Sequence, residues 1–157
     1  MSSIIGGTAS SPKAFDEKTA KEEFRRNLLR RIEIEPIEDG YTHSAEEILE
    51  KAAMEYRPFW SDWVQSIYLE HLNKPAIAAS ILRCVGRLEL DLVKSWGMLM
   101  AISALSHPDL ELREAAVRAL ELWGGEQSLY ALKTRVDVES NSWLLRYIKD
   151  VMEDLSA

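Results

Sequence analysis

The sequence predicts an all-α protein in which about three helical hairpins stack behind one or two extra helices. Apolar residues recur at helical spacing through most of the chain after residue 41. Groups of turn residues interrupt this pattern, so the expected helices are about 10 to 15 residues long and closely connected. Similar apolar stripes also return along the chain, because Leu112 lies 35 residues after Ile77 and 33 residues before Leu145. A period of this size is typical of helical repeat proteins.

The composition limits the chain to one acidic globular domain. Its 157 residues include 26 acidic and 19 basic side chains, which gives a net charge of −7. This balance argues against a general nucleic-acid binder and against a protein bound to anionic membranes. The single cysteine, Cys84, rules out an intramolecular disulfide and any zinc site built on several cysteines.

Residues 1–12 are expected to form a disordered polar tail. They lack the basic and apolar regions of a signal peptide, and no run of about 18 apolar residues occurs in the chain. We therefore expect a cytoplasmic protein with no membrane partner, which agrees with one free thiol.

Residues 13–40 are expected to contain a charged helix and an extended acidic linker. The helix is predicted over residues 12–31, where acids lie early and arginines lie late, an order that complements the helix dipole. Apolar and acidic residues then alternate from Ile32 to Glu38, which favours an extended chain. Pro36 and the pair Asp39-Gly40 break any helix there.

Residues 41–157 are expected to form one helical repeat domain. Ser44 and Glu47 have the spacing of a capping box with Ser44 as the N-cap. Asn73 is expected to cap the helix that carries Pro75 in its first turn. The predicted helices span residues 44–56, 59–72, 74–88, 92–105, 107–123, 127–136 and 142–155. Their short connections predict that the last six pack as three antiparallel pairs.

The stretch from His107 to Leu120 resembles the second helix of a HEAT repeat, of the short type also found in phycobilisome lyases. The matching residues are Pro108, Asp109, Leu112, Arg113, Ala119 and Leu120. Residues 126–132 resemble the first helix of the next repeat, and the resemblance covers residues 59–155. It implies an α-solenoid that binds a partner on its concave face, and it implies no catalytic residue. It also implies that Arg113 is structural and pairs between repeats.

One candidate partner surface lies between Tyr41 and Leu72, where acids outnumber bases and aromatic residues are frequent. Acids beside tryptophan and tyrosine suit a basic protein partner, because these aromatics are common interface hot spots. The alternative is that the tryptophans form core between hairpins. The candidate residues are Glu55, Tyr56, Trp60, Asp62 and Trp63.

Arginines on the second helices of the hairpins form another candidate surface. If these helices line one face, their cations form a positive ladder that receives an acidic peptide or a phosphate backbone. The alternative is a solvated face whose cations pair with nearby acids such as Glu114. The candidate residues are Arg83, Arg87, Arg118 and Arg146.

The sequence predicts no catalytic, cofactor-binding or metal-binding residue. None of His43, His71 and His107 has a histidine or cysteine one helical turn away. Cys84 falls on an apolar stripe, as a small buried residue would. We therefore expect no cofactor and no enzyme activity.

These observations favour a non-catalytic protein-binding or scaffold module that holds one protein partner. A special case is an acidic immunity- or antitoxin-like inhibitor of a basic toxin. The alternative class is a HEAT-like enzyme or ligand binder, either chromophore lyase-like or nucleic-acid-related, although the net charge of −7 argues against the second form. A homo-oligomeric structural protein is a third hypothesis.

Overall fold

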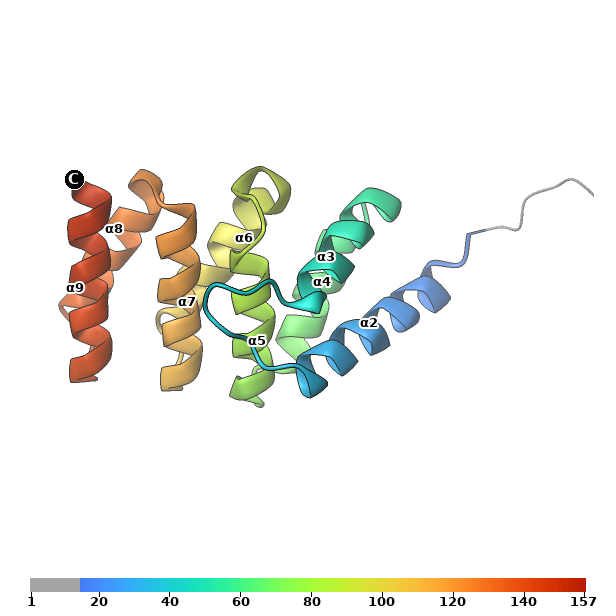
Figure 1. Ribbon diagram of the computed structural model, residues 1–157, viewed down its shortest axis with the longest axis horizontal. Helices are drawn as coiled ribbons and strands as arrows, with labels where there is room; N and C mark the ends of the chain where they lie inside the picture. Colours follow the sequence, from blue (N-terminus) through green and yellow to red (C-terminus); the bar gives the residue numbers. More distant parts are fainter. Residues whose placement is uncertain (1–14) are drawn as a thin grey trace, which may run out of the picture.

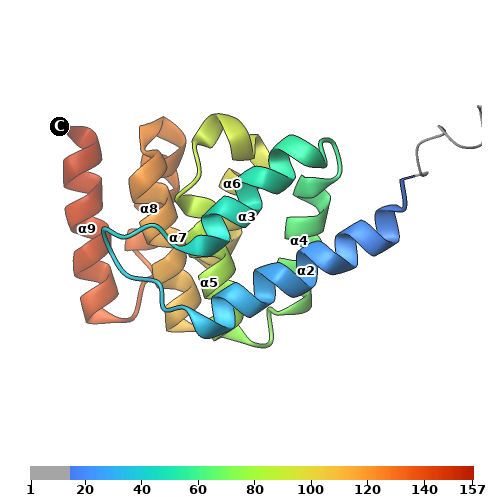
Figure 2. The same ribbon diagram turned by 45° about the vertical axis from the view of Figure 1, so that its right-hand side comes forward.

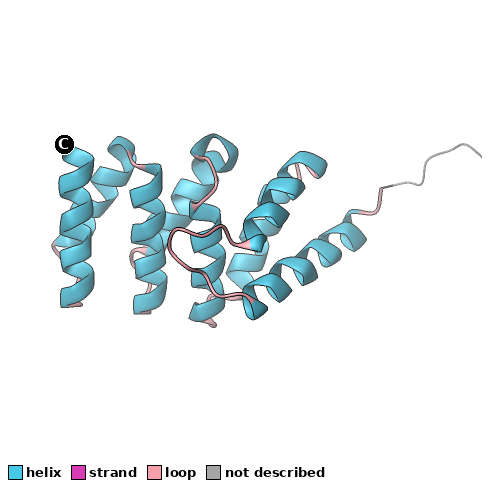
Figure 3. Ribbon diagram, in the orientation of Figure 1, coloured by secondary structure: helices cyan, strands magenta, loops and turns pink. Residues whose placement is uncertain are grey.

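The computed structural model describes residues 15–157, and all regular structure within that range is helical (Figure 3). The helices are α2 (Glu17–Ile34), α3 (Ser44–Glu55), α4 (Trp60–Glu70), α5 (Pro75–Gly86), α6 (Leu90–Ala104), α7 (Leu110–Trp123), α8 (Gly125–Val136) and α9 (Ser142–Ser156). The all-α prediction is confirmed. None of these helices has the length and apolar character needed to cross a membrane.

Three helical hairpins stack side by side in two layers (Figure 1). Helices α5, α7 and α9 contact one another in order and form one layer, and α4, α6 and α8 form the other. Helices α2 and α3 precede the hairpins and cover the first of them. This arrangement confirms the predicted hairpins and the two extra helices.

The apolar stripes that repeat in the sequence point into the space between the layers. Ile81 and Cys84 of α5 and Leu112 and Leu120 of α7 are completely buried. Each hairpin has an apolar face that the next hairpin covers, so we expect the stack to be more stable than any hairpin alone.

Helices α5 and α7 approach each other unusually closely at Gly86 and Ala119. A Cβ atom placed on Gly86 would lie 2.6 Å from the Cβ atom of Ala119. Only a glycine permits this approach, and adding a methyl group would force the helices apart. The close approach fixes the spacing of the side chains that α5 and α7 carry on their outer surface.

Helix α2 differs from the predicted charged helix at both ends. Asp16 is its N-cap and accepts a hydrogen bond from the backbone of Thr19; the predicted start at residue 12 and the predicted tail lie outside the described residues. The helix continues to Ile34, so the prediction that residues 32–34 are extended is wrong. Ile32 packs against the core one turn after Leu28, and this helical stripe outweighs the local alternation.

The cap of α3 lies one residue earlier than predicted. His43 is the N-cap: its Nδ1 accepts from the amide of Ala45, and Glu46 accepts from the amide of His43 at 2.7 Å. Ser44 instead hydrogen-bonds to Glu35. The cap of α5 is likewise Lys74 rather than Asn73, with no side-chain bond. Both corrections reflect a sequence in which two neighbouring polar residues could each begin the helix.

Candidate functional site

The connection between α2 and α3 lies across the outer surface of α5 and reaches toward α7 (Figure 2). We call residues 35–43 the acidic loop. Its two ends are tied together, because Glu35 accepts from the hydroxyl and amide of Ser44 and the backbone oxygen of Glu35 lies 2.8 Å from Nε2 of His43. The Ser44 hydrogen bond lowers the pKa of Glu35 below its ordinary value. A closed neck of this kind is typical of an Ω-loop.

Three arginines hold the tip of the acidic loop. Arg83 of α5 pairs with the carboxylate of Asp39 at 2.8 Å, and Arg118 of α7 reaches the same carboxylate at 3.3 Å. Arg87 donates to the backbone oxygens of Glu38 and Tyr41, both at 2.8 Å. We call these three arginines and the surface around them the arginine face.

Arg87 also joins the arginine face to α3. Its Nη1 lies 3.2 Å from Glu46, the carboxylate that closes the cap of that helix. Both side chains are mostly buried, so this pair is better shielded from water than the pairs with Asp39. The neck and α3 are therefore fixed to α5 independently of the loop tip.

A groove of about 800 Å³ opens between the acidic loop and the surface of α5 and α7. Its lining includes Tyr41, Arg87, Arg118, Glu121, Leu122 and Trp123. The indole of Trp123 donates to the backbone oxygen of Leu88 at 3.0 Å, which fixes one wall. The groove therefore combines cations, carboxylates and apolar surface in one open space.

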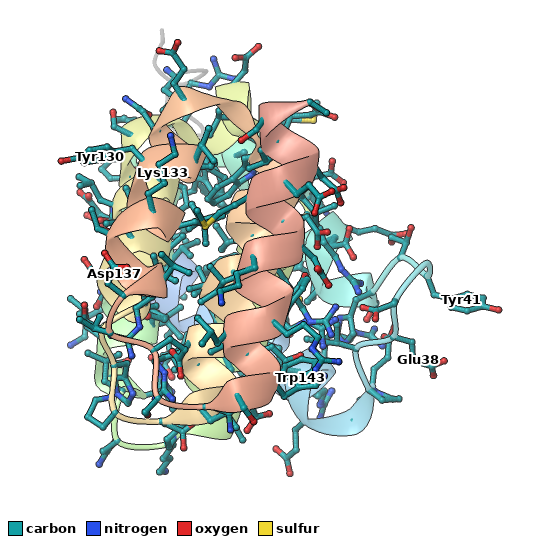
Figure 4. All side chains as sticks on the ribbon, turned by 90° about the vertical axis from the view of Figure 1, so that its left-hand side faces the viewer. Glu38, Tyr41, Tyr130, Lys133, Asp137 and Trp143 are labelled. Carbon is teal, nitrogen blue, oxygen red and sulfur yellow. The ribbon has the colours of Figure 1, made fainter. Side chains whose placement is uncertain are left out.

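Aromatic side chains on α9 continue this surface beyond α7. The guanidinium of Arg118 lies 5.4 Å from the ring centre of Tyr147, and the Tyr147 hydroxyl donates to Glu121. Burial and the Glu121 hydrogen bond raise the pKa of Tyr147 above its ordinary value. The ring of Trp143 lies 5.8 Å from that of Tyr147 and is 53% exposed. Figure 4 shows Trp143 on the same side of the molecule as Glu38 and Tyr41.

Three of the four predicted arginines lie together at one site in the structure. Arg83, Arg87 and Arg118 converge on the acidic loop. Arg146 is exposed on α9 and forms no ion pair with any of residues 15–157. Arg118 also pairs with Glu114, as the alternative of a solvated face expected, so that alternative describes part of its surroundings.

The structure places the tryptophans of the other candidate surface in the core. Trp60 is 5% exposed and meets Trp96 edge-on, while Trp63 is 1% exposed and packs against Tyr56. The indole of Trp63 donates to Glu17 of α2 at 3.0 Å. Burial therefore removes both tryptophans as contact residues on the folded surface.

The other three candidate residues of that surface offer a partner less contact area than exposed tryptophans would. Tyr56 is half-buried, and Glu55 and Asp62 are exposed. Glu55 pairs with Lys51 one turn earlier on α3. The acids are present, but the large aromatic anchors that were expected beside them are not accessible.

A smaller apolar hollow lies on the opposite side of the molecule, between α6 and α8. Leu99 and Tyr130, which are 62% and 71% exposed, are among its lining residues. Figure 4 shows Tyr130 facing away from Trp143. This hollow has no charged pair comparable to the arginine face.

The histidines and the cysteine take part in structural contacts. His43 and His107 each accept a backbone N–H at a helix start, and Nδ1 of His71 lies 2.7 Å from the backbone oxygen of Ile67. Cys84 is completely buried, and burial raises its pKa to about 12. Among residues 15–157, no three histidine, cysteine or acidic side chains are grouped as metal ligands.

Sequence reasoning missed the contribution of Tyr41, Trp143 and Tyr147. Trp143 and Tyr147 are four residues apart, so they share a helix face, and that spacing was a usable signal. It also missed that the acidic linker and the arginine ladder would meet, although their opposite charges were visible.

Comparison with known proteins gave no matching family model, no matching curated protein and no matching solved structure. The geometry of the arginine face therefore carries the functional argument.

Proposed function

We propose that this protein is a non-catalytic binding module that holds a partner protein on the face formed by α5, α7 and α9. The observation that carries the proposal is a groove of about 800 Å³ with an exposed aromatic ring at its margin and another beyond it. Tyr41 lines the groove, and Trp143 lies past Arg118 and Tyr147 on α9. Tyrosine, tryptophan and arginine are the residues most enriched among interface hot spots.

A HEAT-like α-solenoid is part of the same proposal. The stacked hairpins and the pattern from His107 to Leu120 support it. Repeat proteins of this kind use one extended face for binding. A cytoplasmic location is also proposed, on the support of one buried free thiol at Cys84.

The structure gives the arginine face more support than the acidic segment expected to meet a basic partner. Trp60 and Trp63 are buried, so Glu55 and Asp62 stand without large exposed aromatic rings beside them. An immunity- or antitoxin-like role against a basic toxin would depend on that segment. We therefore propose the arginine face as the binding surface.

The test is an affinity-capture experiment that measures how much of a protein partner from the native cell lysate is retained by the full chain and by two single variants. Trp143→Ala removes an exposed ring on the proposed face, and Tyr130→Ala removes a ring of similar exposure on the opposite side. We expect wild type and Tyr130→Ala to retain the same stoichiometric protein partner. Loss of a hot spot of about 2 kcal/mol would weaken capture by Trp143→Ala about 30-fold.

Thermal melting of each variant first tests whether it is folded. Equal capture by Trp143→Ala and wild type would contradict the proposed face, and so would the absence of any stoichiometric partner. Retention of further copies of this chain would instead indicate a homo-oligomer, which sedimentation of the purified protein would measure.

A further inference from the structure

The tip of the acidic loop makes the contacts that a bound peptide would make on the arginine face. Two guanidinium groups meet the carboxylate of Asp39, and a third meets the backbone oxygens of Glu38 and Tyr41. Guanidinium groups match carboxylates and backbone oxygens in geometry as well as in charge. The tip is a turn in which the amide of Tyr41 donates to the backbone oxygen of Glu38. The face therefore already recognises one acidic turn, which belongs to its own chain.

We infer that the arginine face binds an acidic peptide segment of the partner, and that Asp39 is an internal competitor which this segment displaces from Arg83 and Arg118. The inference rests on the proposed function, since it names the chemistry of the partner on the same face. It adds a form of regulation, because the partner must open the loop tip before it binds.

The carboxylate of Asp39 is held weakly enough to be displaced. The side chain of Asp39 is 70% exposed, and both of its ion pairs face water. Exposed ion pairs add little to stability because water and salt screen them. Gly40 and Tyr41, which follow Asp39, are exposed as well.

The neck of the loop can stay closed while the tip opens. Glu35 is bound to Ser44 and to the ring of His43, and neither contact involves Asp39. Ile37, inside the loop, packs against the core between the neck and the tip. Opening therefore needs a change only around Glu38 to Tyr41, and α2 and α3 keep their places.

Displacing Asp39 leaves the guanidinium groups of Arg83 and Arg118 without this carboxylate, so another carboxylate can bind in its place. Arg83 has no second carboxylate partner among residues 15–157. Arg118 keeps Glu114 on its Nε atom, but its Nη1 atom loses its partner. Arg87 keeps Glu46. Two guanidinium groups from adjacent helices thus point at one empty carboxylate position.

The surroundings favour a peptide over a nucleic acid. Glu46 and Glu121 also line the groove, and their charges would repel a continuous phosphate backbone. A peptide carries single carboxylates separated by neutral backbone oxygens, which matches the spacing of Arg83, Arg87 and Arg118 around the loop. The exposed rings of Tyr41 and Trp143 offer contact to its apolar side chains.

The experiment measures binding of a fluorescently labelled peptide with the sequence of residues 35–43, Glu-Pro-Ile-Glu-Asp-Gly-Tyr-Thr-His, to the full chain. Fluorescence anisotropy gives the affinity for wild type, Asp39→Asn, and the double variant Asp39→Asn with Arg83→Gln. Asp62→Asn is the matched control, because it removes an exposed carboxylate elsewhere. A tethered competitor acts at an effective concentration on the order of 1 mM, so wild type should bind the peptide weakly.

We expect Asp39→Asn to bind the peptide at least tenfold more tightly than wild type and Asp62→Asn. The gain should disappear in the double variant, and also for a peptide with asparagine in place of its aspartate. Equal affinities of wild type and Asp39→Asn would overturn the inference. Tighter binding of a single-stranded oligonucleotide than of the peptide by Asp39→Asn would overturn the assignment to a peptide.

The two proposals can fail separately. If capture depends on Trp143 but Asp39→Asn gains no affinity for the peptide, the inference is wrong and the binding module stands. If Asp39→Asn gains affinity but wild type captures no partner, the acidic-peptide site stands and the proposed function is wrong. Thermal melting of Asp39→Asn and the double variant tests whether both remain folded.

Discussion

Arg113 and Glu139 form a bidentate salt bridge between the second hairpin (α6 and α7) and the third (α8 and α9). Nε and Nη2 of Arg113 donate to the two carboxylate oxygens of Glu139 at 2.9 and 3.0 Å. The remaining nitrogen of Arg113 donates to the backbone oxygens of His107 and Pro108. Because Glu139 lies between α8 and α9, one guanidinium fixes the start of α7 against the turn of the next hairpin. This agrees with the structural role between repeats expected for Arg113.

Replacing Arg113 with alanine should destabilise the protein by about 3–5 kcal/mol, because the replacement leaves the buried carboxylate of Glu139 without its main partner. Urea unfolding followed by circular dichroism measures the change. Arg113→Lys keeps the charge but loses the bidentate geometry, so it should destabilise the protein less than Arg113→Ala does.

Lys133→Ala is the control for the loss of one positive charge. Lys133 is exposed on α8 (Figure 4), and its replacement should change stability by less than about 0.5 kcal/mol. An equally small effect of Arg113→Ala would mean that the ion pair does not hold the hairpins together.

Stability should fall at acidic pH in part because of Glu139. Burial acts to raise the pKa of Glu139, but hydrogen bonds from Arg113, the amide of Asn141 and Arg135 outweigh it and lower the pKa. A carboxyl whose pKa is lower in the folded state stabilises the fold above its unfolded pKa, about 4.3 for glutamate. That contribution is lost as pH falls through the lower folded value.

Urea unfolding at a series of pH values tests this expectation with two variants. Glu139→Gln should lose less stability than wild type between pH of about 5 and 3, because it has no carboxyl to protonate at that position. Glu153→Gln, at an exposed position on α9, should follow the wild-type curve. Parallel curves for Glu139→Gln and wild type would count against the role of Glu139.

Replacing Ala119 with aspartate should unfold the protein, because it places a carboxylate against Gly86 in the closest contact between α5 and α7. Leu122→Asp adds the same group on the same helix at a position that is 63% exposed, and its stability should change little. Thermal melting compares the two. A small shift for Ala119→Asp would show that α5 and α7 can separate without cost.

The thiol of Cys84 should be unreactive in the folded protein. It is completely buried and its pKa is raised to about 12, so little thiolate exists near neutral pH. Because Cys84 is the only cysteine, Ellman's reagent should detect no fast-reacting thiol without denaturant and one per chain in urea. Rapid labelling of the native protein would contradict the burial of this side chain.

The sequence was sufficient to predict the hairpins because their signals are local and repeated. The stripe through Leu112 and Leu120 has helical spacing, and Gly124 marks the end of α7. Cap positions were less certain, since His43 and Ser44 are adjacent and both can accept a backbone N–H. Only the contact of Ser44 with Glu35 removes it from the cap.

The candidate site depends on contacts that the helical and repeat spacing of the sequence does not predict. Trp63 looks the same in the sequence whether it lies in a core or on a surface, and α2 covers it through Phe24 and Glu17. The arginines at positions 83, 87 and 118 were predicted as a group because they lie on the second helices of the predicted hairpins. The segment that lies on them comes from before the repeats, so the period could not reveal it.

The order of synthesis gives the contacts of Asp39 a further consequence. A chain emerges from its N-terminus, so Asp39 is made 44 residues before Arg83 and 79 residues before Arg118. Each hairpin can form from neighbouring segments as it emerges, since contacts close in sequence form fastest. Arg83 can therefore meet Asp39 as soon as α5 has been translated, whereas the contact with Arg118 must wait for α7, so the arginines of α5 hold the loop tip before the arginine of α7 does.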